Sequence, residues 1–367
     1  MTGRMTDLIG KPASLIPTPA LVVEIEALER NLRLMSGFFA GRHAKLRPHF
    51  KSHKCVTIAR RQLEAGNAVG ITCAKLSEAE VLAAGGIRDI LIANEIVGPG
   101  KPERVAELAR ACRLTVAVDD ESQVRQLSAA LAGTRAAVGV LVEVDIGLHR
   151  CGVPPGERAL EIARAAAAVP NVDFRGLQAY EGHCTTVLDP EDRRRQVLVS
   201  MRKAVATRRL IEASGLPVRV LSGGGTGTYD MIGLMDGVDE VQAGSYALMD
   251  HYYAKRRPEF AVALSVITTV ISSNGSDHAV LDVGVKGVGT DLGPPVLADG
   301  PDDEISRFES EEHASVKVGG RPLKVGDRVR LFPSHGCTTC NLHRRIFALR
   351  DGLVKDVWPI EGSGCLE

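Results

Sequence analysis

Two regions with different residue patterns predict the fold class of the chain. From about residue 46 to residue 250, eight short β-rich runs alternate with amphipathic or alanine-rich helical stretches. That rhythm is typical of βα units in a parallel sheet, and eight units suggest a closed (β/α)8 TIM-type barrel. After residue 258, β-rich runs separated by turn residues predict antiparallel strands. The sequence therefore predicts an α/β barrel followed by a C-terminal antiparallel β domain.

The predicted domain boundaries follow from these runs. An N-terminal arm and the strand ALVVEI (20–25) occupy residues 1–30, the barrel occupies residues 31–255, and the β domain occupies residues 256–367. The early strand has no partner in the barrel, so we expect it to pack on the β domain and to join the two ends of the chain. The predicted barrel strands are LRPHF (46–50), GITCA (70–74), DILIAN (89–94), LTVAVD (114–119), VGVLVEVD (138–145), FRGLQAY (174–180), VRVLSG (218–223) and EVQAGSY (240–246).

The composition restricts the class of partner. Lysine plus arginine and aspartate plus glutamate both number 45, so the formal net charge is zero. No broad electrostatic footprint for nucleic acid or for an anionic membrane is expected from such a chain. The sequence contains no run of about 18 apolar residues, the length needed to cross a membrane. The eight cysteines are scattered along the chain, as is typical of reduced thiols. We expect a cytoplasmic protein that binds a small molecule.

A basic cluster follows the first predicted barrel strand. In RPHFKSHK (47–54), Lys51 stands at the end of the strand, between His49 and His53. Barrel active sites lie at the carboxyl ends of strands, and a lysine whose pKa is lowered by burial and nearby positive charge could form a Schiff base with a cofactor aldehyde. His53 could act as a base near the same centre. A basic surface loop explains the motif alone equally well.

A glycine-rich segment, SGGGTGTYD (222–230), follows the seventh predicted strand. Glycines let the backbone approach an anion closely, and amides at the start of a following helix can bind a phosphate. The short loop suits one phosphate. The next strand ends in Gly244, Ser245 and Tyr246, which could complete the phosphate-binding site. A tight turn without a ligand is the alternative.

Arg150 lies in EVDIGLHRCG (143–152), directly after the fifth predicted strand. An arginine does not give up its proton, so the ring nitrogen of a cofactor facing it would stay unprotonated and the ring would be a weaker electron sink. A structural ion pair between Arg150 and Asp145 or Glu143 is equally consistent with the sequence.

The segment PSHGCTTCNLH (333–343) in the β domain carries metal-ligand residue types. On an extended strand, His335 and Cys337 would share one face and could bind one metal ion, with Zn²⁺ favoured by the imidazole and thiolate pair. The motif alone is weak, because a buried structural cysteine has the same signature. Cys340 and His343 are further possible ligands, and the remaining cysteines are interpreted as small core residues.

Taken together, these motifs resemble the D-threonine aldolase and D-serine dehydratase-like family, pyridoxal 5'-phosphate (PLP) enzymes of the alanine-racemase fold. The resemblance runs from TPALVV at residue 18 through VKDVWPI at residue 360, and LQAYEGH also resembles a family segment. It implies a PLP barrel with a C-terminal β domain, a divalent metal ion (Zn²⁺, Mn²⁺ or Mg²⁺) and a homodimer. The implied residues are Lys51 for PLP, Arg150 for the ring nitrogen, Gly224, Gly225 and Thr226 for the phosphate, Tyr180 in the cofactor pocket, and His335 and Cys337 for the metal.

Two departures leave the reaction branch open. Aldolases of the family typically carry His-x-Asp at the metal position, whereas His335-x-Cys337 resembles the dehydratases; aldolases also often carry Tyr-His-Gly where this chain has Tyr180-Glu181-Gly182. The surrounding sequence resembles the aldolases more closely.

The leading hypothesis is retro-aldol cleavage of a D-3-hydroxy amino acid, such as D-threonine, to glycine and an aldehyde, with Lys51 and His53 as catalytic residues. The alternatives are dehydration of D-serine or 3-hydroxyaspartate to a 2-oxo acid and ammonia, a non-catalytic PLP carrier, and a racemase. The sequence assigns no role to Glu181, His183 or His313.

Overall fold

The computed structural model describes residues 6–273, 278–298, 300, 305–317 and 323–367. The chain divides into two compact units. The unit that we call the β unit comprises Met1–Leu34, Ser52–Ile58 and Ser245–Gly364, and the barrel unit comprises Met35–Lys51, Ala59–Gly244 and Cys365–Glu367. Within the described ranges, no helix is long and apolar enough to cross a membrane.

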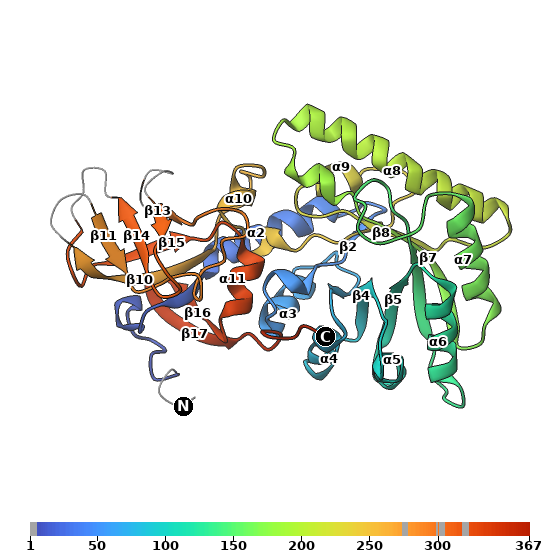
Figure 1. Ribbon diagram of the computed structural model, residues 1–367, viewed down its shortest axis with the longest axis horizontal. Helices are drawn as coiled ribbons and strands as arrows, with labels where there is room; N and C mark the ends of the chain where they lie inside the picture. Colours follow the sequence, from blue (N-terminus) through green and yellow to red (C-terminus); the bar gives the residue numbers. More distant parts are fainter. Residues whose placement is uncertain (1–5, 274–277, 299, 301–304, 318–322) are drawn as a thin grey trace. The chain divides into compact units, whose positions relative to one another are not determined.

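The barrel unit is built on a parallel sheet of eight strands in the order β2-β9-β8-β7-β6-β5-β4-β3. Every predicted barrel strand overlaps one of them, which confirms the α/β class. Figure 1 shows α4 to α8 along the outer side of this curved sheet. The strands are β2 (Lys45–Leu46), β3 (Ile71–Cys73), β4 (Asp89–Glu95), β5 (Arg113–Val118), β6 (Val138–Glu143), β7 (Val172–Ala179), β8 (Val220–Gly223) and β9 (Glu240–Val241).

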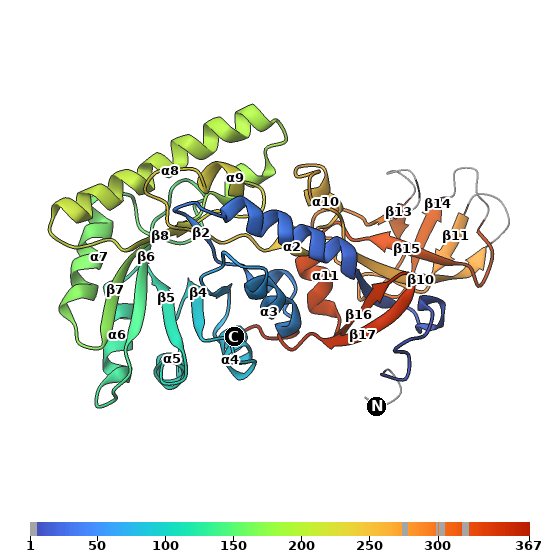
Figure 2. The same ribbon diagram turned by 180° about the vertical axis from the view of Figure 1, so that it is seen from behind.

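The segment that follows β2 closes this sheet into a ring. On one side the His49 amide donates to the Ala243 carbonyl oxygen at 3.1 Å, beyond the end of β9. On the other side the Thr72 amide of β3 donates to the Pro48 carbonyl oxygen at 2.8 Å, within a parallel bridge between His49 and Thr72. Figure 2 shows this sheet from behind, with β2 and β4 to β8 labelled. Because the ring is closed, the carboxyl ends of all eight strands gather at one edge.

Helices separate the strands, as the alternation in the sequence predicts. Asp120 caps α6 (Glu121–Leu131) by accepting the Ser122 amide at 2.7 Å, and Asp189 caps α8 (Pro190–Ala213) by accepting the Asp192 amide at 2.7 Å. Side-chain caps of this kind satisfy amides that have no partner inside the helix. The other helices between β1 and β9 are α2 (Ile25–Phe39), α3 (Val56–Glu64), α4 (Leu76–Ala84), α5 (Lys101–Leu108), α7 (Glu157–Ala168) and α9 (Tyr229–Ile232).

The β unit contains a mixed sheet organised around the N-terminal strand. β1 (Ala20–Glu24) pairs antiparallel with β10 (Leu264–Ser273) and parallel with β16 (Arg345–Arg350). The early strand therefore pairs with strands that lie more than 240 residues later in the chain. Its Val22 packs with Ile267 and Phe347 in a buried apolar cluster. The remaining elements are β11 (His278–Leu281), β12 (Val296–Leu297), β13 (Ile305–Phe308), β14 (Ala314–Lys317), β15 (Arg328–Phe332), β17 (Leu353–Pro359), α10 (His251–Ala254) and α11 (Gly336–Leu342).

Gly223, the last residue of β8, provides a test of this sheet. A Cβ there would lie 2.0 Å from the Ala179 carbonyl oxygen of β7, so Gly223→Ala should push the strands apart and lower the free energy of unfolding by roughly 2–4 kcal/mol. Gly37→Ala is the control, because nothing lies within 4 Å of that position on α2, and it should raise the free energy of unfolding by about 1 kcal/mol. Urea unfolding measures both. A Gly223→Ala variant as stable as the wild type would contradict the β7–β8 packing.

Candidate active site

Lys51 lies at the carboxyl edge of the barrel, in the 3-10 helix η2 (Phe50–Ser52). Its side chain is half-buried, and its amide donates to Nδ1 of His49 at 3.4 Å. Since the His49 amide is itself bonded to the Ala243 carbonyl, the backbone that carries Lys51 is tied to the neighbouring strand. The predicted strand 46–50 is shorter in the structure, since β2 ends at Leu46 and Lys51 lies beyond it in η2.

Arg150 and Tyr180 lie together at the same edge, after β6 and β7. The guanidinium carbon of Arg150 is 5.6 Å from the centre of the Tyr180 ring, within cation–π range. In the described chain no ion pair joins Arg150 to Asp145 or Glu143. Asp145 is instead bonded to the His149 ring at 2.9 Å, and Glu143 accepts from Gln178. Arg150 is thus exposed and available to a ligand of the barrel edge.

The glycine-rich loop after β8 has the properties of an anion cradle. Gly224 has a φ of +75°, which favours glycine. A Cβ on Gly225 would lie 3.6 Å from the Tyr180 ring, so this ring lines the loop. The buried amides of Gly227 and Gly244 donate to no described residue. Buried amides need an acceptor, and a single phosphate would supply one.

The helix predicted after this loop is shorter than the motif suggested. α9 spans only Tyr229–Ile232, so the loop amides, rather than a helix dipole, would provide most of the anion affinity. Thr226 is 2% exposed and belongs to the same turn.

A chain of buried polar side chains crosses the barrel interior below this edge. Gln178 on β7 donates to Glu143 on β6, and Gln242 donates to Gln178 and to Ser222, both at 2.9 Å. Burial raises the pKa of Glu143 to about 8, and the Gln178 hydrogen bond only partly offsets it. Sequence reasoning missed this chain, because each member is one polar residue in an otherwise apolar strand.

The β unit places His335 and Cys337 differently from the prediction. They do not lie on an extended strand: β15 ends at Phe332, His335 is the N-cap of α11, and Cys337 lies in its first turn. The two side chains are nevertheless neighbours, since a hydrogen bond and the charge of Cys337 both act on the His335 ring. A helix start thus brings together the pair that strand alternation was expected to align.

Two aspartates that the sequence did not single out support this pair. Asp291 accepts from His335 Nδ1 at 2.5 Å and from the Thr338 hydroxyl at 2.6 Å. Asp250, which is 1% exposed, accepts the Gly336 amide at 2.9 Å and fixes the start of α11. A carboxylate on one nitrogen of a histidine orients the other nitrogen for a metal ion. Asp291 therefore makes Nε2 of His335 the available ligand atom.

The electrostatics of the pair are those of a protonated imidazole. Burial lowers the pKa of His335, but Cys337 and Asp291 outweigh it and raise that pKa to about 10. The other two candidate ligands are His343 and Cys340. His343 Nε2 lies 2.7 Å from the Gly287 carbonyl oxygen, and Cys340 is fully buried. Across the described residues, no group of three or more His, Cys, Asp and Glu side chains is arranged to hold a metal ion. Two protein donors would leave the remaining positions to water or substrate.

The other candidate residues of the β unit are His53, Ser245 and Tyr246. His53 is fully buried, and its Nδ1 accepts the Cys55 amide at 3.2 Å. With Nδ1 acting as an acceptor, Nε2 is the ring nitrogen that carries a proton. Ser245 and Tyr246 lie in the 3-10 helix η4 (Ser245–Ala247), with Ser245 half-buried and Tyr246 1% exposed.

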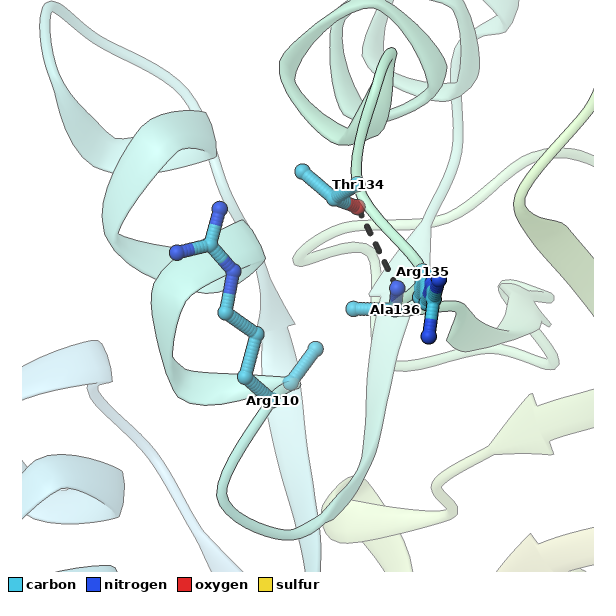
Figure 3. Close-up of a pocket in the computed structure, with 5 residues that line it drawn as sticks. Arg110, Thr134, Arg135 and Ala136 are labelled. Carbon is cyan, nitrogen blue, oxygen red and sulfur yellow. Dashed lines mark hydrogen bonds between the residues drawn. The ribbon is translucent and has the colours of Figure 1, made fainter.

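An open pocket lies away from these residues. It is formed where α5 leads into β5 and α6 leads into β6, which is the amino-terminal edge of the sheet. Figure 3 shows Arg110 and Arg135 beside it, with the Ala136 amide donating to Thr134 Oγ1 at 3.2 Å. Barrel chemistry takes place at the opposite edge, so this pocket has no part in the site.

Sequence comparisons agree with this architecture. Residues 23–251 match the alanine racemase N-terminal domain, and residues 263–349 match the putative serine dehydratase domain. The chain is 38% identical to a 3-hydroxy-D-aspartate aldolase of Paracoccus denitrificans, over 97% of this chain and 95% of that protein, and 38% identical to a D-threonine aldolase of Arthrobacter sp. with the same coverage. A D-threo-3-hydroxyaspartate dehydratase of Delftia sp. is 28% identical over 88% of this chain and 92% of its own length.

The chain belongs to the D-threonine aldolase and D-serine dehydratase-like family. The crystal structure of D-threonine aldolase from Filomicrobium marinum matches with a TM-score of 0.95 and 38% identity, covering 98% of both chains. D-threo-3-hydroxyaspartate dehydratase from Delftia matches with a TM-score of 0.82 and 27% identity, covering 95% of this chain and 98% of that one. The resemblance drawn from the motifs is confirmed, and the chain is an enzyme of a lyase family.

Glu143 makes stability depend on pH. A carboxyl whose pKa is raised by folding stabilises the folded state most at low pH, and this contribution is lost as the pH rises from the ordinary value of 4.5 to about 8. Glu143→Gln should therefore be more stable than the wild type at pH 8 and differ less at pH 5. Denaturant unfolding at the two pH values tests this, with exposed Glu64→Gln as the control. An equal difference at both pH values would contradict a neutral buried Glu143.

Proposed function

We propose that this enzyme is a PLP- and divalent-metal-dependent aldolase, which cleaves D-3-hydroxy amino acids of the D-threonine type to glycine and an aldehyde. The observation that carries the proposal is the 38% identity with two aldolases along 97% of the chain. The barrel edge supports it, because a lysine, an arginine, a tyrosine and a glycine loop with unpaired amides occur there together.

The residues of the barrel unit fit PLP. Lys51 Nζ would hold the cofactor aldehyde, Arg150 would face the ring nitrogen, and Tyr180 would line the ring. Gly224, Gly225, Thr226 and Gly244 would bind the phosphate, with Ser245 and Tyr246 following them in the chain. When bound, PLP supplies an electron sink for the bond that breaks at the substrate α-carbon. Arg150, as a permanent cation, would keep the ring nitrogen unprotonated.

The residues of the β unit fit a divalent ion, with His335 Nε2 and Cys337 Sγ as protein donors. Zn²⁺, Mn²⁺ or Mg²⁺ would lower the pKa of a hydroxyl group bound to it. Asp291 would keep the imidazole oriented. We assign His53 to movement of the hydroxyl proton. Its Cys55 contact, at 3.2 Å, is at the long end of hydrogen bonds and can be given up when the ring is protonated.

We further propose the domain limits 1–30, 31–255 and 256–367, with PLP held by the second segment and the metal by the third. The protein is proposed to be a cytoplasmic homodimer whose partner is a small-molecule substrate rather than nucleic acid or a membrane. None of the eight cysteines, all of them within the described residues, forms a disulfide, which supports a reducing compartment. Light scattering on the purified protein tests the dimer.

The second candidate function is dehydration of the same substrate class. Cys337 favours it, because His-x-Cys resembles the dehydratase branch, and the Delftia dehydratase shares the fold. The same residues would then assist departure of the hydroxyl group while a base removes the α-proton.

Product analysis separates the two reactions. We expect incubation with D-threonine to give equal amounts of glycine and acetaldehyde, and incubation with D-serine to give glycine and formaldehyde with little pyruvate or ammonia. Glycine is measured by amino-acid chromatography and pyruvate by lactate dehydrogenase coupling. The appearance of oxo acid and ammonia without glycine would overturn the aldolase assignment.

Removal of the metal should abolish turnover and leave PLP bound. Asp291→Asn should weaken metal affinity by about 10–100-fold, while the same change at exposed Asp236 should have no effect. Metal affinity should rise with pH, because the ion competes with the proton on His335. Turnover is measured in chelator-buffered metal at several pH values. Full activity after extensive treatment with EDTA would exclude His335 and Cys337 as a catalytic metal site.

A further inference from the structure

Glu181 is a buried carboxyl group that the proposed reaction does not use. It follows Tyr180 and caps the 3-10 helix η3 (Gly182–Thr186), and its side chain is fully buried. Oε1 lies 2.5 Å from the Thr228 hydroxyl, whereas Oε2 has no hydrogen-bond partner among the described residues. A buried carboxylate with an unpaired oxygen is costly in its charged form, so its presence beside the glycine loop needs an explanation.

Thr228 connects this carboxyl to the loop. The Gly225 amide donates to Thr228 Oγ1 at 3.2 Å, and the Thr228 amide donates to the Gly225 carbonyl at 3.1 Å. A charged Glu181 can only accept, so the Thr228 hydroxyl hydrogen must point toward it. A protonated Glu181 can donate to Thr228 Oγ1 instead, which frees the hydroxyl hydrogen for another acceptor. The direction of this hydrogen bond therefore depends on one proton.

The surroundings of Glu181 favour the neutral form. Burial raises its pKa to about 7, and the Thr228 hydroxyl with the backbone amides of Glu181 and Gly224 offsets only part of that effect. Cys184 on η3 faces the carboxyl, and its own pKa is raised by burial and by Glu181 to about 11. Burial and hydrogen bonds are the causes of this shift. The negative charge of an anion in the loop would raise the pKa of Glu181 further.

The remaining ionisable group of η3 is His183. Its Nε2 lies 3.1 Å from the Ser200 hydroxyl on α8. Burial and the charge of Lys203 lower the pKa of His183, which disfavours a positive charge on this ring.

We propose that Glu181 is a proton-linked positioning residue of the phosphate loop: it takes up one proton from solvent when the loop binds a phosphate dianion, and then holds the loop by donating to Thr228 Oγ1. A negative charge at Gly224–Thr226 disfavours a second negative charge nearby, so binding and protonation are linked. The inference rests on the proposed assignment of this loop to the cofactor phosphate.

The test compares PLP with pyridoxal, which lacks the phosphate. Apo-enzyme is titrated with each compound from pH 6 to pH 9, followed by absorbance, and the ratio of the two dissociation constants is taken at each pH. Protonation of Lys51 affects both compounds and cancels in the ratio. Titration of the free PLP phosphate is the same for every variant and cancels when variants are compared.

The preference for PLP is the dissociation constant of pyridoxal divided by that of PLP. We expect this ratio to fall in the wild type as the pH rises above about 7, by up to tenfold per pH unit more than in Glu181→Gln. Glu181→Gln keeps the shape and a donor to Thr228 but cannot titrate, so its preference should lack this fall. Glu191→Gln, an exposed control on α8, should behave as the wild type. Thr228→Val serves if Glu181→Gln does not fold: it removes a hydrogen bond that lowers the pKa of Glu181, so the fall should begin at a higher pH than in the wild type.

Identical pH profiles for the wild type, Glu181→Gln and Thr228→Val would overturn the proposal for Glu181 while leaving the proposed function intact. Absence of PLP binding by the wild type, or equal affinity for PLP and pyridoxal at every pH, would instead overturn the assignment of the loop to the phosphate.

Discussion

The candidate cofactor edge depends on how residues 46–49 close the barrel. This segment bonds to the strand ends on both sides, through His49 to Ala243 and through Pro48 to Thr72. Arg47 reinforces the closure: its guanidinium donates to both carboxylate oxygens of Glu240 at 2.7 and 2.8 Å. It also donates to Asp89 of β4 at 2.9 Å. Lys51 follows four residues later, so its position is set by this closure.

The same geometry explains why the barrel tolerates buried acids. Its interior is filled by side chains from neighbouring strands, and a polar member persists only when its neighbours satisfy it. Glu143 is stabilised by Gln178, which is itself bonded to Gln242. Glu181 Oε1 accepts the Thr228 hydroxyl at 2.5 Å. Neutral carboxyl groups at these positions avoid a buried charge.

The sequence predicted those parts of the structure that depend on local pattern. The eight strands, the lysine-containing segment that follows the first and the glycine loop after the seventh all follow from periodicity and from the order of βα units. The placement of β1 followed from the absence of a barrel partner. Pairing over long separations left no such trace: Asp291 meets His335 across 44 residues, and Gln178 meets Gln242 across 64.

Local hydrogen bonds and short element lengths explain where the structure differs from the sequence prediction. The His335 segment was expected to be extended, but Asp250 accepts the Gly336 amide and favours a helix start there. α9 ends after one turn at Gly233. The strands β12 and β13 have two and four residues, too short to show an alternating pattern.

The central claim is that Lys51 binds the cofactor covalently at the barrel edge. Reduction of the PLP-loaded enzyme with borohydride, followed by peptide mapping, tests it most directly. The account predicts one pyridoxyl group per chain on the peptide that contains Lys51. Modification of a different lysine, such as Lys54 or Lys75, or no modification at all, would contradict it.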